Sequence, residues 1–217
     1  MYQAILFDLD DTLYDLRSYW HGRLGRALDV VGVQHPEFDR SALVRSAMEE
    51  HIYIEHLPEF LRRRGVADEA LIAQSHDIFR QGWFDQLVLY DDAIQTLETL
   101  REQFRLGLIT NGPSAIQRPK IERFELVKYF DVLIVSGEVD VAKPDPAIFA
   151  LALGRLGVEP HQALFVGDSP EHDLRGAEAA GVDFVWMNAH GQELPEGFKE
   201  PMAVIERLSD VIAIAQR

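Results

Sequence analysis

The chain has 217 residues, 47% of them apolar and 26% charged, so it can bury a full core and is not expected to be disordered. Its formal net charge of -15 argues against binding a nucleic acid polymer or an anionic membrane through the overall field. The absence of cysteine excludes disulfides, thiolate metal sites and a cysteine nucleophile. Neither a basic-then-apolar leader nor an apolar run of the roughly 18 residues needed to span a bilayer is visible, so we expect a cytoplasmic protein.

Five short runs of apolar, β-branched or aromatic residues recur along the chain and predict strands. They are Ala4–Leu9, Leu106–Thr110, Val132–Ser136, Leu164–Gly167 and Phe184–Met187. Near-continuous apolar runs are typical of a parallel sheet that is covered on both faces. Helical patterns lie between the later runs, and two of them start at Asp145-Pro146 and Ser169-Pro170, because proline suits the first helical position. Strands that alternate with helices predict a doubly wound α/β fold.

The segment from about Asp15 to Tyr90 differs from the rest of the chain. It contains helix-length patterns, two dense polar segments and no convincing strand. We therefore expect an all-α insertion between the first strand and the second. The predicted organisation is a core of residues 1–14 and 91–217 with an inserted helical domain of residues 15–90.

The first predicted strand ends in a pair of acids. Asp8 and Asp10 would point to the same side if the strand stayed regular. Like charges held that close destabilise each other unless a cation or a shared proton relieves them. The pair therefore predicts a metal-and-phosphate site at the carboxyl edge of the sheet, with a turn and a helix cap as the alternative for this pair alone. Asp11 has the opposite parity, and we expect turn or cap contacts from it.

Further polar residues follow three later strands, at the edge where open α/β sheets place their ligands. The run Thr110–Gly112 offers a hydroxyl, an amide and a flexible backbone for phosphate oxygens, although a simple Asn-Gly turn is at least as good an explanation of it alone. Lys143 follows the third strand and, by itself, is most simply a solvated charge. Gly167–Ser169, followed by Asp173, is by itself also typical of a helix cap.

In this order the four signals resemble the motifs of the haloacid dehalogenase superfamily. The motifs correspond to Asp8-x-Asp10-x-Thr12, to Thr110, to Lys143, and to Gly167-Asp168 with Asp173. The resemblance covers the whole chain. It implies a Rossmann-like catalytic core and identifies the insertion with the helical cap of the first type in this superfamily.

The resemblance also implies a reaction. Asp8 would be the nucleophile and would form an aspartyl phosphate. Asp10 would protonate the leaving alcohol and then take a proton from the hydrolytic water. Mg²⁺, held by Asp8, the carbonyl of Asp10 and Asp168, would neutralise the repulsion between the nucleophile and the phosphate.

The remaining motif residues would bind and stabilise. Thr110 and the backbone of Asn111 would hold the transferring phosphate, and Lys143 would offset charge on both the nucleophile and the phosphate. Asp173 would support the metal or orient Lys143. Ser169 would do the same, with helix capping as an equal explanation.

Asp10 also bears on the reaction class, because halide leaves without a proton and the dehalogenases of the superfamily lack an acid there. We therefore expect a magnesium-dependent phosphomonoesterase acting on a small phosphorylated metabolite, as a monomer or a homodimer. Phe184–Asn188 and Leu9–Leu13 look like the pyrimidine-nucleotidase branch, which favours a nucleoside monophosphate. A phosphoglycolate or phosphosugar phosphatase, a phosphomutase and a non-catalytic binding protein on the same fold stay open.

Residues just after the first motif are candidates for setting specificity, because a cap closes over the leaving group. They are Arg17, Tyr19, Trp20, His21 and Arg23. An arginine could reach an anionic leaving group and an aromatic ring could stack on a base, whereas a solvated face with core aromatics is the alternative for each. The histidines are scattered without metal-ligand spacing, so we expect no zinc site.

Overall fold

The computed structural model describes residues 1–50, 52–82 and 84–216. The chain divides into two compact units: Met1–Asp15 with Val88–Arg217, here called the sheet unit, and Leu16–Leu87, here called the helical unit. Within the described ranges, no helix is long and apolar enough to cross a bilayer.

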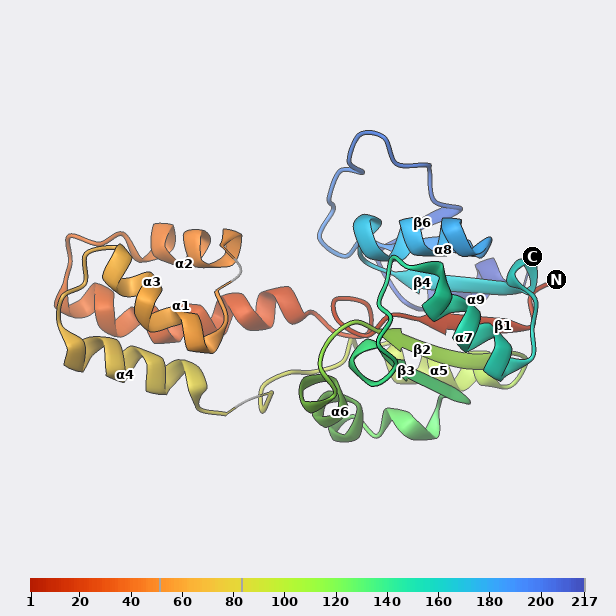
Figure 1. Ribbon diagram of the computed structural model, residues 1–217, viewed down its shortest axis with the longest axis horizontal. Helices are drawn as coiled ribbons and strands as arrows, with labels where there is room; N and C mark the ends of the chain where they lie inside the picture. The colour runs from red at the N-terminus through yellow and green to blue at the C-terminus, as the bar shows by residue number, and fades with distance from the viewer. Residues whose placement is uncertain (51, 83, 217) are drawn as a thin grey trace. The chain divides into compact units, whose positions relative to one another are not determined.

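The sheet unit is built on six parallel strands, which confirms the predicted α/β class (Figure 1). They are β1 (Ala4–Phe7), β2 (Arg105–Thr110), β3 (Val132–Val135), β4 (Ala163–Gly167), β5 (Asp183–Met187) and β6 (Ala203–Ile205). Their order is β3-β2-β1-β4-β5-β6. The chain builds outward from β1 on one side and then restarts at β4 on the other, so the order reverses between β1 and β4. Open α/β sheets bind ligands at the carboxyl end of such a reversal.

Apart from shifts of one residue at strand ends, the observed strands differ from the predicted ones in two places. The first predicted strand extended to Leu9, but β1 ends at Phe7, so neither acid of the pair lies within the regular strand. Strand β6 was not predicted, because it has only three residues and the middle one, Val204, is 54% exposed. A short edge strand of this kind carries little of the apolar pattern on which sequence reasoning depends.

Helices cover both faces of this sheet. They are α5 (Ala93–Arg101), α6 (Ser114–Arg123), α7 (Pro146–Leu156), α8 (Arg175–Ala180) and α9 (Asp210–Ala215), with short helical turns at Leu126–Lys128, Ser136–Glu138 and Pro160–Gln162. Helix α7 packs against α8, and α5 packs against α9. The core beneath α7 is close-packed, with the rings of Phe149 and Phe165 edge to face and their centroids 5.0 Å apart.

The two predicted helix starts have different outcomes. Asp145 caps α7 by accepting a hydrogen bond of 2.9 Å from the amide of Ala147, as its place before Pro146 predicted. After Ser169, the chain instead forms a single π-helical turn, Pro170–Leu174, and α8 begins only at Arg175. This wider turn decides where Asp173 lies, as described below.

The helical unit consists of α1 (Leu16–Gln34), α2 (Arg40–Glu49), α3 (Leu57–Arg63) and α4 (Glu69–Arg80), with a 3₁₀ turn at Ile54–His56. Helix α1 packs against both α2 and α4 around a common apolar core. Asp39 and Asp68 cap α2 and α4 by accepting hydrogen bonds from the backbone amides of the second and third residues of each helix. The unit therefore has its own core and its own helix-end signals.

Arg23 in α1 lies inside the helical unit and is only 3% exposed. Its guanidinium donates to the hydroxyl of Tyr19 at 3.1 Å, to the carbonyl of Gly82 at 2.7 Å and to the carbonyl of Phe79. It also lies over the rings of Tyr19, Trp20 and Phe79. Arg23, one of the specificity candidates, thus binds the last turn of α4 and Gly82, which follows it.

We expect Arg23→Met to lower the free energy of unfolding by about 1–3 kcal/mol, because buried carbonyls lose their donor. Urea denaturation of the full chain measures this change. The matched control is Arg26→Met on the exposed face of the same helix, which should stay within about 0.5 kcal/mol of the parent. Equal effects of the two substitutions would contradict this account of Arg23.

Candidate active site

The candidate site lies where β1, β2 and β4 end. Asp8 directly follows β1, Thr110 is the last residue of β2, and Asp168 directly follows β4. Because β1 lies between β2 and β4 in register, these three positions meet at one edge of the sheet. The predicted residues of separate motifs are therefore brought together by the strand order.

A change of backbone direction after β1 separates the two acids of the pair. The amide of Asp8 still donates to the carbonyl of Val166 at 2.9 Å, which continues the β1–β4 pairing by one residue. Asp11 then adopts a left-handed conformation with a φ of 57°. This agrees with the turn role expected of Asp11. The chain already bends at Leu9, between the two acids, which interrupts the regular alternation that would have kept Asp8 and Asp10 on one side.

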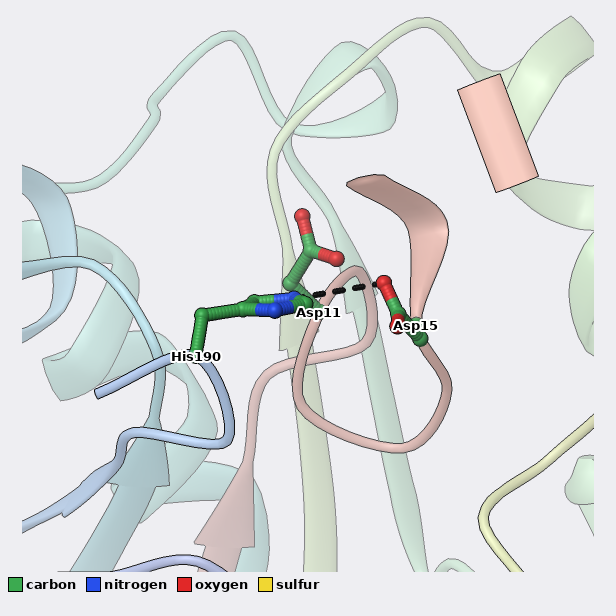
Figure 2. Close-up of side chains that lie close together, drawn as sticks. All are labelled: Asp11, Asp15 and His190. Carbon is green, nitrogen blue, oxygen red and sulfur yellow. Dashed lines mark ion pairs between the residues drawn. The ribbon is translucent and has the colours of Figure 1, made fainter. Parts of the chain in front are cut away.

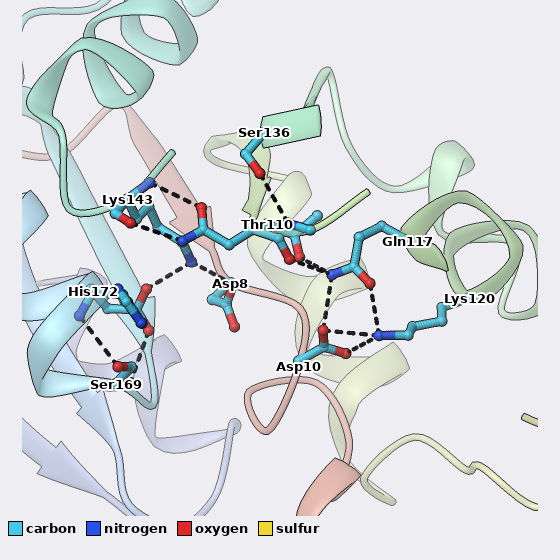
Figure 3. Close-up of polar contacts among 12 residues, drawn as sticks. Asp8, Asp10, Thr110, Gln117, Lys120, Ser136, Lys143, Ser169 and His172 are labelled. Atoms are coloured by element: carbon cyan, nitrogen blue, oxygen red, sulfur yellow. Dashed lines mark hydrogen bonds and ion pairs between the residues drawn. The ribbon is translucent and has the colours of Figure 1, made fainter. Parts of the chain in front are cut away.

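Asp8 is buried and paired with Lys143. The ammonium of Lys143 lies 2.5 Å from Asp8 Oδ1 and 2.7 Å from Asp173 Oδ1 (Figure 3). Burial of Lys143 disfavours its charged form, but Asp173 and Asp8 together raise the pKa of this lysine. Lys143 is therefore a charged residue within the site, and its solvated alternative is wrong.

The side chain of Asn111 holds Lys143 in place. Its amide nitrogen donates to the carbonyl of Lys143 at 2.9 Å, and its oxygen accepts from the amide of Lys143 at 2.9 Å. This reciprocal pair joins the end of β2 to the loop that carries the lysine. The side chain of Asn111 is thus engaged with protein backbone, and the expected phosphate contact of Asn111 stays a prediction for its main chain.

Asp173 is positioned by the π-helical turn. Its amide donates to the carbonyl of Ser169 at 2.8 Å, and its Oδ2 accepts from the amide of Ser169 at 3.0 Å. Ser169 Oγ accepts from the amide of His172 at 3.3 Å, which is a capping contact. Ser169 was expected either to support the site or to cap a helix, and the structure shows the capping contact. The carboxylate of Asp173 is the one that contacts Lys143.

Asp168 is oriented from the next strand. Trp186, the fourth residue of β5, is buried and donates its indole N–H to the carbonyl of Asp168 at 2.7 Å. The buried ring of Trp186 thus supports the site from the interior of the sheet unit. The sequence does not predict this contact, because it depends on the register between β4 and β5, which pairs Trp186 with Gly167.

Three carboxylates gather at this edge. Asp8, Asp168 and Asp173 each offer one oxygen within 4.8 Å of the others. Burial raises the pKa of Asp8 to about 7, with Lys143 opposing the rise and Asp173 and Asp10 adding to it. Burial, then Asp173 and Asp8, hold the pKa of Asp168 well above its ordinary value. Three carboxylates thus gather beside one lysine, and hard oxygen ligands of this kind fit a divalent cation such as Mg²⁺.

Asp10 has a separate set of partners. Its Oδ1 accepts from the hydroxyl of Tyr14 at 2.5 Å and from Lys120 at 2.7 Å; its Oδ2 accepts from Gln117 at 2.9 Å and from Lys120 at 2.9 Å. Gln117 also donates to Thr110 Oγ1 at 2.5 Å. Gln117 and Lys120, which lie in α6, were missed from the sequence.

Their only sequence signal was a spacing of three within a strongly polar helix. Helix α6 shows no apolar stripe that would reveal which of its polar residues face inward. The burial of Gln117 and Lys120 is set by the packing of α6.

A second acidic group lies on the loop after Asp10. Asp11, Asp15 and His190 each offer one ligand atom within 4.8 Å of the others, and His190 Nε2 lies 3.2 Å from Asp15 Oδ1 (Figure 2). His190 comes from the segment after β5, so sequence spacing alone could not place it here. The pair gives His190 a carboxylate partner within the sheet unit.

Comparison with known proteins places this geometry among hydrolases. The family described as haloacid dehalogenase-like hydrolase matches residues 2–181. The chain is 35% identical over 192 residues to glyceraldehyde 3-phosphate phosphatase of Methanopyrus kandleri, covering 84% of this chain and 82% of that protein. It is 44% identical over 106 residues to pyrimidine 5'-nucleotidase YjjG of Escherichia coli, covering 48% and 47%. The solved structure of HAD phosphatase from Thermococcus onnurineus is similar with a TM-score of 0.66 and 28% identity, covering 98% of this chain and 97% of that one.

We expect Gly167→Ala to disturb Asp173 directly. A Cβ at position 167 would lie 2.4 Å from Asp173 Oδ2 and 2.6 Å from its Cγ, so the carboxylate must move. Urea denaturation should show a loss of about 1–3 kcal/mol. The control is Gly154→Ala in α7, where an added Cβ meets nothing within 4 Å and should stabilise the helix by about 0.5–1 kcal/mol. An unchanged stability of Gly167→Ala would contradict the tight fit.

The raised pKa of Asp8 predicts a pH-dependent stability. Between its ordinary value of 3.8 and about 7, the folded protein keeps a proton that the unfolded chain has released. The Asp8 contribution therefore lowers the stability of the metal-free protein as pH rises through this window. Because Mg²⁺ binds the ionised carboxylates, the increase in Tm on adding Mg²⁺ should grow over the same window.

Thermal unfolding in EDTA and in Mg²⁺ across this pH range measures both effects. Asp8→Asn removes the ionisation, so the difference in Tm between parent and variant should isolate the Asp8 contribution from that of other carboxylates. A difference that does not change with pH would show that Asp8 titrates at its ordinary value.

Proposed function

The chain belongs to the haloacid dehalogenase-like hydrolases, and we propose that it is a magnesium-dependent phosphomonoesterase that works through an aspartyl phosphate. The observation that carries the proposal is the division of partners at the end of β1. Asp8 pairs with Lys143 beside the acidic group, whereas Asp10 is held by α6. A buried nucleophile and a separately held acid are what two-step hydrolysis of a phosphate ester requires.

Asp8 is the proposed nucleophile. One of its oxygens attacks phosphorus while the bond from phosphorus to the ester oxygen breaks. Lys143, 2.5 Å from Asp8 Oδ1, offsets the negative charge that gathers as the phosphate approaches. Thr110 at the end of β2 and the main chain of Asn111 are the proposed contacts for the phosphate oxygens.

Asp8, Asp168 and the carbonyl of Asp10 are the proposed Mg²⁺ ligands, and Asp173 supports the group through Lys143. The fit rests on three clustered carboxylates, two of which, Asp8 and Asp173, contact one lysine. When bound, Mg²⁺ supplies charge neutralisation at the nucleophile and the phosphate. Asp8 and Asp168, whose burial raises their proton affinity, release their protons in favour of the cation.

Asp10 is the proposed acid and base. It gives a proton to the leaving alcohol, and it then takes one from the water that attacks the aspartyl phosphate. This role favours a phosphatase over a dehalogenase, because halide needs no proton.

The substrate is proposed to be a small phosphorylated metabolite. The relatives named above act on a triose phosphate and on pyrimidine nucleotides. The first similarity covers most of both proteins and the second about half, so a phosphosugar and a nucleoside monophosphate are both substrates to assay. The helical unit is proposed to act as the cap that selects among them. With Arg23 engaged in its own unit, Arg17, which is exposed, is the stronger candidate of these two arginines for contact with the leaving group.

A panel of sugar phosphates, nucleoside monophosphates and phosphoglycolate tests the reaction. Mg²⁺-dependent release of inorganic phosphate is expected, and EDTA should abolish it. Asp8→Asn should lower kcat by roughly 10³-fold or more, because the proposed covalent intermediate forms on the Asp8 carboxylate. The control is Asp145→Asn, since asparagine also caps helices and the site is untouched.

Two results would redirect the proposal. Conversion of one phosphosugar isomer into another with little free phosphate would identify a phosphomutase. Tight binding across the panel without turnover would identify a non-catalytic binding protein. Full activity of Asp8→Asn would refute the nucleophile assignment.

A further inference from the structure

Helix α6 presents two buried polar residues to a single carboxylate. Gln117 is 1% exposed and Lys120 is 3% exposed, whereas the side chain of Asp10 is 26% exposed. Buried polar and charged groups destabilise a protein unless they are paired. Gln117 and Lys120 lie one turn apart on α6, and both donate hydrogen bonds to the carboxylate of Asp10 (Figure 3). The buried polar groups on this face of α6 are therefore paired with a single acid.

The orientation of the Gln117 amide follows from its neighbour. Lys120 can only donate hydrogen bonds, and its ammonium lies 2.7 Å from Gln117 Oε1. The oxygen of the amide therefore faces Lys120, and the nitrogen faces the other way. That nitrogen meets three acceptors: Asp10 Oδ2 at 2.9 Å, Thr110 Oγ1 at 2.5 Å and the carbonyl of Asn111 at 2.9 Å.

The contacts of Asp10 are not equally replaceable. A carboxylate has about four acceptor positions, and Tyr14, Gln117 and the two contacts of Lys120 account for four. Proton exchange with a substrate therefore requires one contact to give way. Gln117 has two N–H groups for three acceptors, so it can release Asp10 and keep both hydrogen bonds. Tyr14 is fully buried, so if it released Asp10 its hydroxyl would lose the hydrogen bond to this carboxylate in the interior.

We infer that Lys120 and Gln117 are positioning residues for the proton transfers of Asp10, an inference that rests on the proposed phosphatase reaction. Lys120 and Tyr14 anchor Oδ1. Gln117 releases its hydrogen bond to Oδ2 of Asp10, so that this oxygen can exchange the proton. While that hydrogen bond is in place, Gln117 connects Oδ2 to Thr110 at the proposed phosphate site.

The proton follows a balanced path. Oδ2–H gives its proton to the ester oxygen as the bond from phosphorus to that oxygen breaks. Oδ2 then takes a proton from water as the water oxygen attacks phosphorus and the bond to Asp8 breaks.

The first test compares leaving groups. p-Nitrophenolate leaves without a proton, so the first step on p-nitrophenyl phosphate does not need Asp10, whereas the second step does. We expect Lys120→Met to retain a burst of about one p-nitrophenolate per active site and to slow the steady state. On the best alkyl phosphate of the panel, kcat should fall by about 10²-fold, with a smaller change in KM.

The matched control is Arg118→Met on the same helix. Arg118 pairs with Glu138 on the surface, so the variant removes a cation from α6 without touching Asp10. It should behave as the parent with both substrates.

A double-mutant cycle separates positioning from a general structural effect. If Lys120 acts through Asp10, then Lys120→Met added to Asp10→Asn should cost less than about threefold beyond the single variant. Gln117→Met should show the same dependence on Asp10.

The outcomes distinguish a failure of the proposed phosphatase function from a failure of the positioning role of Lys120 and Gln117. A parent enzyme that releases no phosphate from any substrate overturns the proposed function and this inference with it. A parent that turns over, with Lys120→Met either like Arg118→Met or additive with Asp10→Asn, overturns the inference alone.

Discussion

The site depends on one constraint: two carboxylates close to the end of a buried strand must each be neutralised, and by different cations. Asp8 is paired with Lys143 and Asp10 with Lys120. A single shared cation would hold the two acids as one coupled pair. Two lysines from different segments, Lys120 in α6 and Lys143 after β3, let the same short segment present a nucleophile and a separate proton carrier, which is the division of labour that we propose.

Each lysine is in turn held by a polar residue from the segment that follows β2. Asn111, after β2, binds the backbone of Lys143 through both atoms of its amide. Gln117 contacts Lys120 and also Thr110, the last residue of β2. The two ion pairs are therefore connected through β2, so the candidate phosphate contacts and the two acids belong to one hydrogen-bonded structure. Buried polar networks of this kind are stable only when their members are satisfied, which makes the site rigid as well as charged.

Much of this was predictable from particular residues. The apolar runs gave five strands, and the acids and lysine after them marked the correct edge of the sheet, because parallel strands in a doubly wound fold direct their carboxyl ends to one side. Two kinds of feature were not predictable. The contact of Trp186 with Asp168 depends on register between strands. The burial of Gln117 and Lys120 depends on how a strongly polar helix packs, and its sequence carries no stripe that says so.

The sequence by itself determined the fold class and the superfamily, because apolar periodicity and the order of short motifs are local properties of the chain. It also determined that two acids would need relief at the end of β1. Only the tertiary structure decided which cation relieves which acid. That choice depends on β1 lying between β2 and β4 and on the bend at Leu9, which separates the two acids along the chain. Electrostatic pairing is decided by distances of a few ångströms, and distances between residues over 100 positions apart are set by packing.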